Sequence, residues 1–218
     1  MFIPRMFLIV SGGYPPDADF LAHKARDARM IIAADRGARY CLEAGVTPHL
    51  LVGDMDSLSP HELHEISGTG IEVIRFSPEK DATDTHIALD EAIKRGANAI
   101  EIIAATGSRF DHALANVHLL YRAYLAGIPA RIVDQCQEIV LLAGTESFED
   151  REGATVSLLP LTAQVEEITL KGFSYELSGA RMEIGNPYGV SNVITARKAT
   201  VTIGKGILVA VLVTGEDS

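Results

Sequence analysis

The sequence contains no tryptophan and only two cysteines among its 218 residues. Cys41 and Cys136 lie far apart in apolar surroundings, which is neither the spacing of a metal site nor that of a disulfide framework. We therefore expect two reduced cysteines in the core, and we expect any metal site to use other ligands.

Long apolar runs and positive charge are also scarce. No apolar run reaches the length of about 18 residues that a membrane-spanning helix needs, and residues 1–5 are not a charged segment leading into an apolar one. Lys and Arg number 19 against 29 Asp and Glu, a formal net charge of -10, whereas nucleic acids and anionic membranes attract clustered cations. We expect a cytoplasmic protein that binds neither nucleic acid nor membrane.

The first part of the chain alternates short apolar segments with amphipathic ones. Apolar runs ending in Gly, Ser or Asp predict strands, and segments of helical spacing between them predict helices. Alternating strands and helices favour a parallel sheet with helices on its faces. The predicted strands are residues 6–10, 30–34, 50–52, 71–76, 99–105 and 132–134. The predicted helices are residues 17–29, 39–44, one that starts at Ser59-Pro60-His61-Glu62, 85–95 and a long one ending at 126.

The pattern changes from about residue 137 to short β-rich segments without helical period. These segments are residues 138–142, 154–159, 165–170, 190–195, 199–203 and 207–213, and Gly204-Lys205-Gly206 is a candidate hairpin between the last two. The predicted fold class is α/β. An N-terminal three-layer domain with a mostly parallel sheet, residues 1–136, precedes a C-terminal all-β antiparallel sandwich domain, residues 137–218.

Acidic residues follow several predicted strands of the first domain. Asp35 follows one strand, the run Gly53-Asp54-Met55-Asp56-Ser57 follows the next, and Asp81 and Asp84 follow the fourth. Ligands of parallel sheets bind beyond the carboxyl ends of the strands, so we expect these side chains to converge at one edge. A single Asp at a strand end also suits the capping of a turn or helix, as do Thr83 and Asp84 before the next helix.

The converging carboxylates indicate a divalent cation. Asp54, Asp56, Asp81 and Asp84 in one pocket raise each other's pKa values unless a cation lies between them. Oxygen ligands without a Cys/His cluster favour Mg²⁺ over Zn²⁺, and Mg²⁺ in proteins commonly accompanies a nucleotide phosphate.

Two cationic residues and one polar helix face lie near acidic residues in the sequence. Lys80 and Arg109 are suited to neutralise phosphate oxygens, although Lys80 also fits a surface loop and Arg109 an ion pair with Asp111. His112 and Asn116 lie four residues apart on one helix face, which fits either a ligand contact or a buried polar pair that joins helix to sheet.

Four motifs together resemble the thiamine pyrophosphokinase family, in their order and spacing and over nearly the whole chain. They are Gly53-Asp54-Met55-Asp56-Ser57-Leu58, Lys80-Asp81-Ala82-Thr83-Asp84, Gly107-Ser108-Arg109-Phe110-Asp111-His112 with Asn116, and Gly189-Val190-Ser191-Asn192. The resemblance implies transfer of a pyrophosphoryl group from ATP to the hydroxyl of thiamine with Mg²⁺, giving thiamine diphosphate and AMP. It also implies a homodimer whose site lies between the α/β half of one subunit and the sandwich of the other.

The resemblance assigns roles residue by residue. It implies that the metal and phosphate carboxylates are Asp54, Asp56, Asp81 and Asp84, and that the phosphate-binding cations are Lys80 and Arg109. It implies that the other substrate contacts are Asp35, Thr83, Asp111, His112, Asn116, Ser191 and Asn192, the last two near thiamine.

The chain departs from the family pattern at three points. Arg36 stands where the family has the middle residue of an Asp-Gly-Gly turn, and Ser108 stands where the third motif often has Gly. Because Trp is absent, any aromatic stacking on thiamine comes from another residue, such as Tyr175 or Tyr188.

The residues alone leave other functions open. One alternative is a Mg²⁺-dependent phosphoryl or nucleotidyl transferase that acts on another small alcohol. A second alternative is a non-catalytic sensor of nucleotide or thiamine that keeps the site without the reaction.

Overall fold

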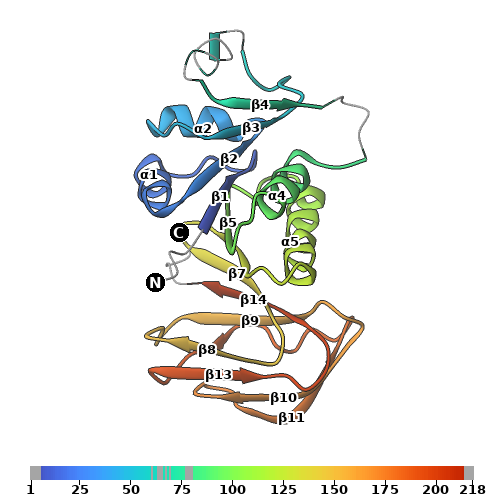
Figure 1. Ribbon diagram of the computed structural model, residues 1–218. Coiled ribbons are helices and arrows are strands. Elements are labelled where there is room, and N and C mark those ends of the chain that lie inside the picture. The colour runs from blue at the N-terminus through green and yellow to red at the C-terminus, as the bar shows by residue number, and fades with distance from the viewer. Residues whose placement is uncertain are drawn as a thin grey trace. The chain divides into compact units, whose positions relative to one another are not determined.

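The computed structural model describes residues 6–59, 61–62, 66, 68, 70–76 and 81–213. The chain forms two compact units, Met1–Gln135 and Cys136–Ser218 (Figure 1). The first is α/β with a parallel sheet and the second consists of antiparallel strands, so the predicted fold class is confirmed. Among the described residues, no helix has the length and apolar character needed to cross a membrane.

All strand pairs of the first unit's sheet are parallel, and the strand order is β6-β5-β1-β2-β3-β4. Its central strands are nearly continuous apolar runs, as expected of a sheet covered on both faces, and most of their side chains are buried. The strands are β1 (Met6–Val10), β2 (Met30–Ala34), β3 (Leu50–Gly53), β4 (Glu72–Arg75), β5 (Ala99–Ile103) and β6 (Ala130–Val133).

Helices cover both faces of this sheet, with α1 and α2 on one face and α4 and α5 on the other (Figure 1). The helices are α1 (Ala18–Asp27), α2 (Gly37–Glu43), α4 (Asp84–Lys94) and α5 (Phe110–Leu125). Alternate strand residues point to opposite faces, so Leu8 and Ala33 pack in one core cluster with Leu21 of α1 and Cys41 of α2. The result is the predicted three-layer unit.

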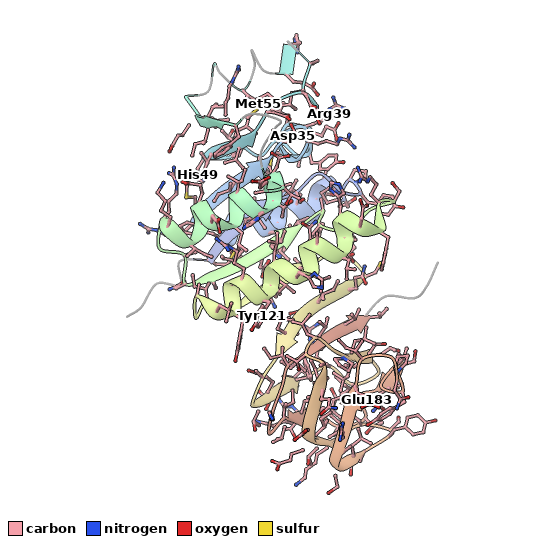
Figure 2. The ribbon with its side chains drawn as sticks, turned by 90° about the vertical axis from the view of Figure 1, so that its right-hand side faces the viewer. Asp35, Arg39, His49, Met55, Tyr121 and Glu183 are labelled. Atoms are coloured by element: carbon pink, nitrogen blue, oxygen red, sulfur yellow. The ribbon has the colours of Figure 1, made fainter. Side chains whose placement is uncertain are left out.

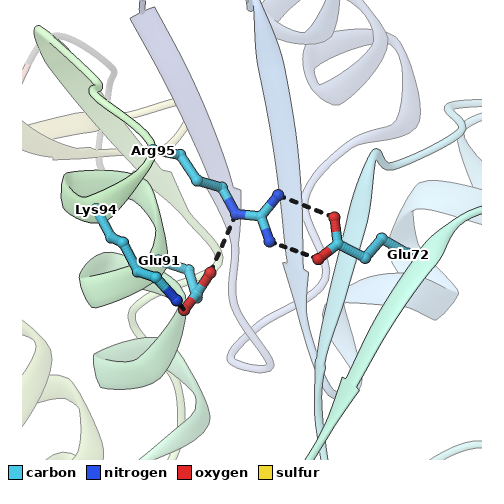
Figure 3. Close-up of polar contacts among 4 residues, drawn as sticks. All are labelled: Glu72, Glu91, Lys94 and Arg95. Carbon is cyan, nitrogen blue, oxygen red and sulfur yellow. Dashed lines mark hydrogen bonds and ion pairs between the residues drawn. The ribbon is translucent and has the colours of Figure 1, made fainter.

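A charged network ties the edge strand β4 to the end of α4 (Figure 3). Arg95 Nη1 and Nη2 donate to the carboxylate of Glu72 over 2.9 and 2.6 Å, and Arg95 Nε donates to Glu91 over 3.0 Å. Lys94 Nζ donates to the other Glu91 oxygen over 3.0 Å. Edge strands have fewer pairing partners, and this network gives β4 an attachment besides its pairing with β3.

The second unit contains two antiparallel sheets, ordered β12-β9-β14-β7 and β11-β10-β13-β8. Alternating strand residues such as Val156 and Leu158 of β9 and Val201 of β13 form one buried cluster, the arrangement of a sandwich. The strands are β7 (Gln137–Leu142), β8 (Thr145–Glu149), β9 (Thr155–Pro160), β10 (Gln164–Lys171), β11 (Leu177–Glu183), β12 (Asn192–Val193), β13 (Lys198–Thr202) and β14 (Leu208–Val213).

Two expectations for this unit were wrong. Gly204-Lys205-Gly206 is not a hairpin turn, because β13 and β14 belong to different sheets and Lys205 pairs instead with Glu166. Cys136 is exposed, whereas Cys41 is buried as expected. Strands β8 and β11 were not predicted from the sequence.

Candidate active site

Three carboxylates meet at the carboxyl ends of β2 and β3. Asp35 follows β2, Asp54 and Asp56 follow β3, and one ligand atom from each lies within 4.8 Å of the others. The two strands are parallel neighbours with Ala34 opposite Val52, so the residues that follow them meet at the same edge of the sheet. The acids that gather at this edge are Asp35, Asp54 and Asp56.

Asp35 lies in a confined position within this cluster. Its backbone has a left-handed φ of +46°, which non-glycine residues rarely adopt. Its Oδ1 is buried and has no hydrogen-bond partner among the described residues. Burial raises the pKa of Asp35 above its usual 3.8; a hydrogen bond with Ser57 opposes this rise, and the charges of Asp84 and Asp56 add to it. A cation at this point would offset the cost of the buried charge.

The loop after β3 is ordered by its own side chains. The Asp56 N–H donates to Asp54 Oδ1 over 3.2 Å, and Ser57 Oγ donates to Asp56 Oδ1 over 3.1 Å. Met55, between the two acids, has φ +69° and a buried side chain in the core cluster with Leu58. The loop therefore anchors Met55 inward while Asp54 and Asp56 remain partly or fully exposed.

A cavity of about 590 Å³ adjoins the acidic cluster and shares Asp35 with it. Loops at the ends of β1, β2 and β5 and the first turns of α4 and α5 form its wall. The lining residues are 11–15, 34–36, Tyr40, Ser57, 82–85, 105–109, His112, Ala113 and Asn116. A cavity of this size and position is typical of a ligand site at the end of a parallel sheet.

Gly13 packs the loop after β1 against the loop after β5. A Cβ atom at Gly13 would lie 2.0 Å from the carbonyl oxygen of Thr106, so no larger residue fits. The N–H groups of Gly13 and Tyr14 donate to Ala104 and Thr106, each over 2.7 Å, and Tyr40 Oη donates to the Gly13 carbonyl over 2.7 Å. These two amides are engaged within the protein, so this turn shapes the cavity wall and offers neither of them to a phosphate.

The first turn of α4 faces the cavity. Thr83 caps the helix by accepting from the His86 N–H over 3.2 Å, and Ser11 Oγ and Thr85 Oγ1 lie 2.5 Å apart in a buried hydrogen bond. Thr83 and Asp84 both line the cavity. Capping and ligand contact are thus compatible for Thr83, since helix N-termini also attract anions.

The third motif lines the cavity wall and also joins α5 to the loop after β5. Arg109 donates to Asp111 from Nε over 3.2 Å and from Nη2 over 2.5 Å, and these bonds lower the pKa of Asp111. Asn116 is buried and its Nδ2 donates to the Ala105 carbonyl over 2.7 Å, which joins α5 to the loop after β5. His112 is exposed and lines the cavity.

The remaining predicted site residues lie elsewhere. Asp81 is exposed and is not among the lining residues, and Lys80 lies outside the described residues. Ser191 and Asn192 belong to the second unit, where the buried Asn192 side chain accepts from the Tyr175 N–H over 3.0 Å and donates to the Tyr175 carbonyl over 2.8 Å. Ser191 is exposed with φ +59°.

Sequence reasoning missed several residues that shape the site. Asp35 was expected at the same edge as the other acids, but it was assigned to the substrate and not to the metal. Ser11 and Tyr40 were not assigned to the site, because their partners Thr85 and Gly13 lie at distant positions in the chain.

Comparisons with known proteins match both units of this chain to one family. Residues 21–132 match the family model "Thiamin pyrophosphokinase, catalytic domain", and residues 145–208 match "Thiamin pyrophosphokinase, vitamin B1 binding domain". A thiamine pyrophosphokinase of Bacillus subtilis (strain 168) is 31% identical over 205 residues, covering 93% of this chain and 96% of that protein.

Solved structures extend the similarity to the whole fold. The crystal structure of thiamine pyrophosphokinase from Bacillus subtilis has a TM-score of 0.86 at 28% identity and covers 96% of this chain and 99% of its own. That of thiamin pyrophosphokinase from Geobacillus thermodenitrificans has a TM-score of 0.83 at 31% identity, covering 97% and 99%. This chain belongs to the thiamine pyrophosphokinase family of enzymes.

Proposed function

We propose that this chain transfers the pyrophosphoryl group of ATP to the hydroxyl of thiamine, giving thiamine diphosphate and AMP, with Mg²⁺ as the cofactor. The observation that carries the proposal is the cluster of Asp35, Asp54 and Asp56, which shares Asp35 with the cavity in unit 1. Family membership supplies the reaction class.

The residues of the cluster fit a magnesium ion. Three carboxylates offer the oxygen ligands that Mg²⁺ prefers, and the buried, unpartnered Oδ1 of Asp35 provides an acceptor without a donor. In this proposal Asp35, Asp54 and Asp56 hold the ion, and Asp84 adds negative charge on the cavity side. When bound, the ion neutralises charge on the triphosphate of the nucleotide. Metal ligation by Asp81 stays a prediction.

Two arginines on the cavity wall differ in whether a carboxylate of the protein already pairs with them. Arg109 is paired with Asp111, whereas no carboxylate forms an ion pair with Arg36 in the part of the chain that the structure describes. A free guanidinium suits two parallel hydrogen bonds to a phosphate. We assign Arg36 to the triphosphate, with Arg109 beside it, and phosphate binding by Lys80 stays a prediction.

The residues of the cavity then position an in-line transfer. The thiamine hydroxyl attacks the β-phosphorus, the bond from that phosphorus to the α-β bridging oxygen breaks, and AMP leaves with the electron pair on that oxygen. Such transition states are loose, so positioning and charge neutralisation supply most of the rate. We assign Asp84 to accept the hydroxyl proton, because Asp84 lines the cavity and Asp81 does not.

The second unit takes the thiamine in this proposal. Residues 137–218 act as the thiamine-binding and dimerisation domain and residues 1–136 as the catalytic domain. Ser191 is exposed and suited to contact thiamine, whereas Asn192 holds the backbone of Tyr175 and acts through it. The enzyme works as a homodimer in the cytoplasm.

The experiment is to mix the protein with ATP, Mg²⁺ and thiamine and to follow AMP and thiamine diphosphate together. We expect both products to accumulate in equal amounts and only when all three components are present. ADP in place of AMP would show a different transfer, and tight binding without either product would show a sensor.

A further inference from the structure

Arg39 of α2 forms a two-point ion pair with Glu62, which lies beyond the acidic loop. Arg39 Nε donates to Glu62 Oε1 over 2.6 Å and Nη2 donates to Glu62 Oε2 over 3.2 Å. The Nη2 group also donates to the carbonyl oxygen of Ser57 over 3.3 Å. One side chain therefore holds two points of the chain that follows β3.

Glu62 is itself held in place by Ser59. Glu62 Oε2 accepts from the Ser59 N–H over 2.7 Å, and Ser59 Oγ accepts from the Glu62 N–H over 3.3 Å, the reciprocal pattern of a capping box. The hydrogen bonds from Arg39 and Ser59 hold the pKa of Glu62 at about 2. Glu62 thus remains ionised and paired throughout the neutral pH range.

This pair connects the two halves of the acidic cluster. Arg39 lies on α2, which begins two residues after Asp35, and Ser57, which it holds, is bonded through Oγ to Asp56. Figure 2 shows Asp35, Arg39 and Met55 near the same end of the first unit. Asp35 thus starts the segment that carries Arg39, and Asp54 and Asp56 lie in the loop that Arg39 binds.

We infer that Arg39 and Glu62 are positioning residues for the divalent cation: they fix the loop of Asp54 and Asp56 at its distance from Asp35. The inference rests on the proposed metal role of the cluster. Residues behind metal ligands commonly change affinity when they are replaced, because the ligands lose their orientation. The pair is partly exposed, with 40% of the Arg39 side chain and 19% of the Glu62 side chain accessible. Ion pairs that solvent reaches add little to overall stability, so we expect its loss to change the metal site more than the fold.

The experiment measures binding of Mn²⁺, a paramagnetic stand-in for Mg²⁺, to the full-length protein without nucleotide or thiamine. The free Mn²⁺ signal in electron paramagnetic resonance gives the dissociation constant directly. We expect Arg39→Ala to weaken Mn²⁺ binding by about tenfold, the lower end of the usual range for such residues. Glu62→Gln keeps the bonds with Ser59 and removes the charge, so it weakens Mn²⁺ binding in the same direction, and this prediction holds even if Arg39→Ala fails to fold.

Arg122→Ala is the matched control. Arg122 forms an equivalent two-point pair with Asp90 between α5 and α4, through bonds of 2.5 and 2.9 Å, and touches none of the three acids. We expect this control to bind Mn²⁺ as the wild type does. The inference is overturned if Arg39→Ala and Glu62→Gln keep wild-type affinity, or if Arg122→Ala weakens binding equally.

A double variant tests whether the two residues act together. Arg39→Ala with Glu62→Gln is expected to weaken Mn²⁺ binding no more than either single change, because the effects of replacing two partners in one interaction are not additive. Additive losses would contradict the pairing. The assay for AMP and thiamine diphosphate stands apart from these measurements. Wild-type protein that binds Mn²⁺ but forms no AMP would refute the proposed function, and unchanged Mn²⁺ binding in the variants would refute only this inference.

Discussion

Gly53 and Asp35 are in close contact at the ends of β3 and β2, where a Cβ atom on Gly53 would lie 3.1 Å from the Cβ of Asp35. The Asp35 N–H donates to the Val52 carbonyl over 2.8 Å at the same point. The missing side chain at Gly53 therefore lets the first acid of the cluster approach the loop that carries the other two.

Gly53→Ala is expected to disturb this contact. Gly53 has φ +152°, a conformation that residues with a side chain rarely adopt, and the added methyl group meets Asp35. We expect a loss of about 1–3 kcal/mol in the free energy of unfolding together with weaker Mn²⁺ binding. Urea unfolding and Mn²⁺ titration measure the two effects, and Gly45→Ala, whose new Cβ has no neighbour within 4 Å, separates backbone strain from contact. Wild-type Mn²⁺ affinity in Gly53→Ala would contradict the role given to the contact.

Asp56→Asn is expected to lower turnover by about two orders of magnitude or more. The reason is that it removes a carboxylate charge that holds the metal in the proposed site. The side chain is exposed, so the unfolding midpoint should stay close to that of the wild type. Steady-state release of AMP measures the effect, with the exposed Asp19→Asn on α1 as control. Near wild-type AMP release by Asp56→Asn would show that Asp56 has no role in the active site.

Arg36→Gly tests the cation that faces the cavity. Hydrogen bonds to charged groups contribute about 1.5–3 kcal/mol, so losing them should raise the KM for ATP roughly tenfold or more. The KM for thiamine should not change, because the role assigned to Arg36 concerns only the triphosphate, and Arg36→Lys should recover part of the loss. Equal changes in both KM values, or none in that for ATP, would count against the assignment.

Glu101→Gln tests a buried charge on β5, away from the acidic cluster. Burial raises the pKa of Glu101, whereas the interactions with Lys24, at 2.9 Å, and with Arg131 lower it. The lowering effects are larger together, so the pKa of Glu101 lies below its usual 4.5. A carboxyl with a lowered pKa in the folded state stabilises the protein above its unfolded pKa, and this contribution is lost as the pH falls through the folded value. We expect the variant to be about 1–3 kcal/mol less stable at neutral pH, and the difference to shrink below pH 4.5. Urea unfolding across that range checks it, and a difference independent of pH would refute the linkage.

The architecture of the first unit followed from the sequence because its signals are local. The runs at residues 30–34 and 50–53 are apolar and buried on both faces, and both lead directly into acids, so strand and acidic end were predicted together. The local sequence did not show which acids would cluster together. Asp35 joins Asp54 and Asp56 because β2 and β3 are neighbours in the sheet. Asp81 was expected beside them from the same strand-end pattern and from its motif, but it comes six residues after the end of β4 and is not one of the three clustered acids.

The second unit shows where pattern reasoning fails. Strand β8 is almost entirely exposed, and it exists through pairing with β13, so it has no apolar alternation to detect. Strand β11 contains Gly179 with φ +62°, and its pairing with β10 shifts register. Likewise Gly204-Lys205-Gly206 has the composition of a hairpin turn, and only its long-range bridge to Glu166 shows that it leads from one sheet to the other.

The central claim is that a pyrophosphoryl group moves intact, and ATP labelled at the β-phosphorus tests it most directly. The protein is incubated with the labelled ATP, Mg²⁺ and thiamine, and the label is followed in the separated products. We predict that the label appears in thiamine diphosphate while unlabelled AMP forms in equal amount. Label retained in ADP, with thiamine monophosphate as the product, would contradict the proposed function.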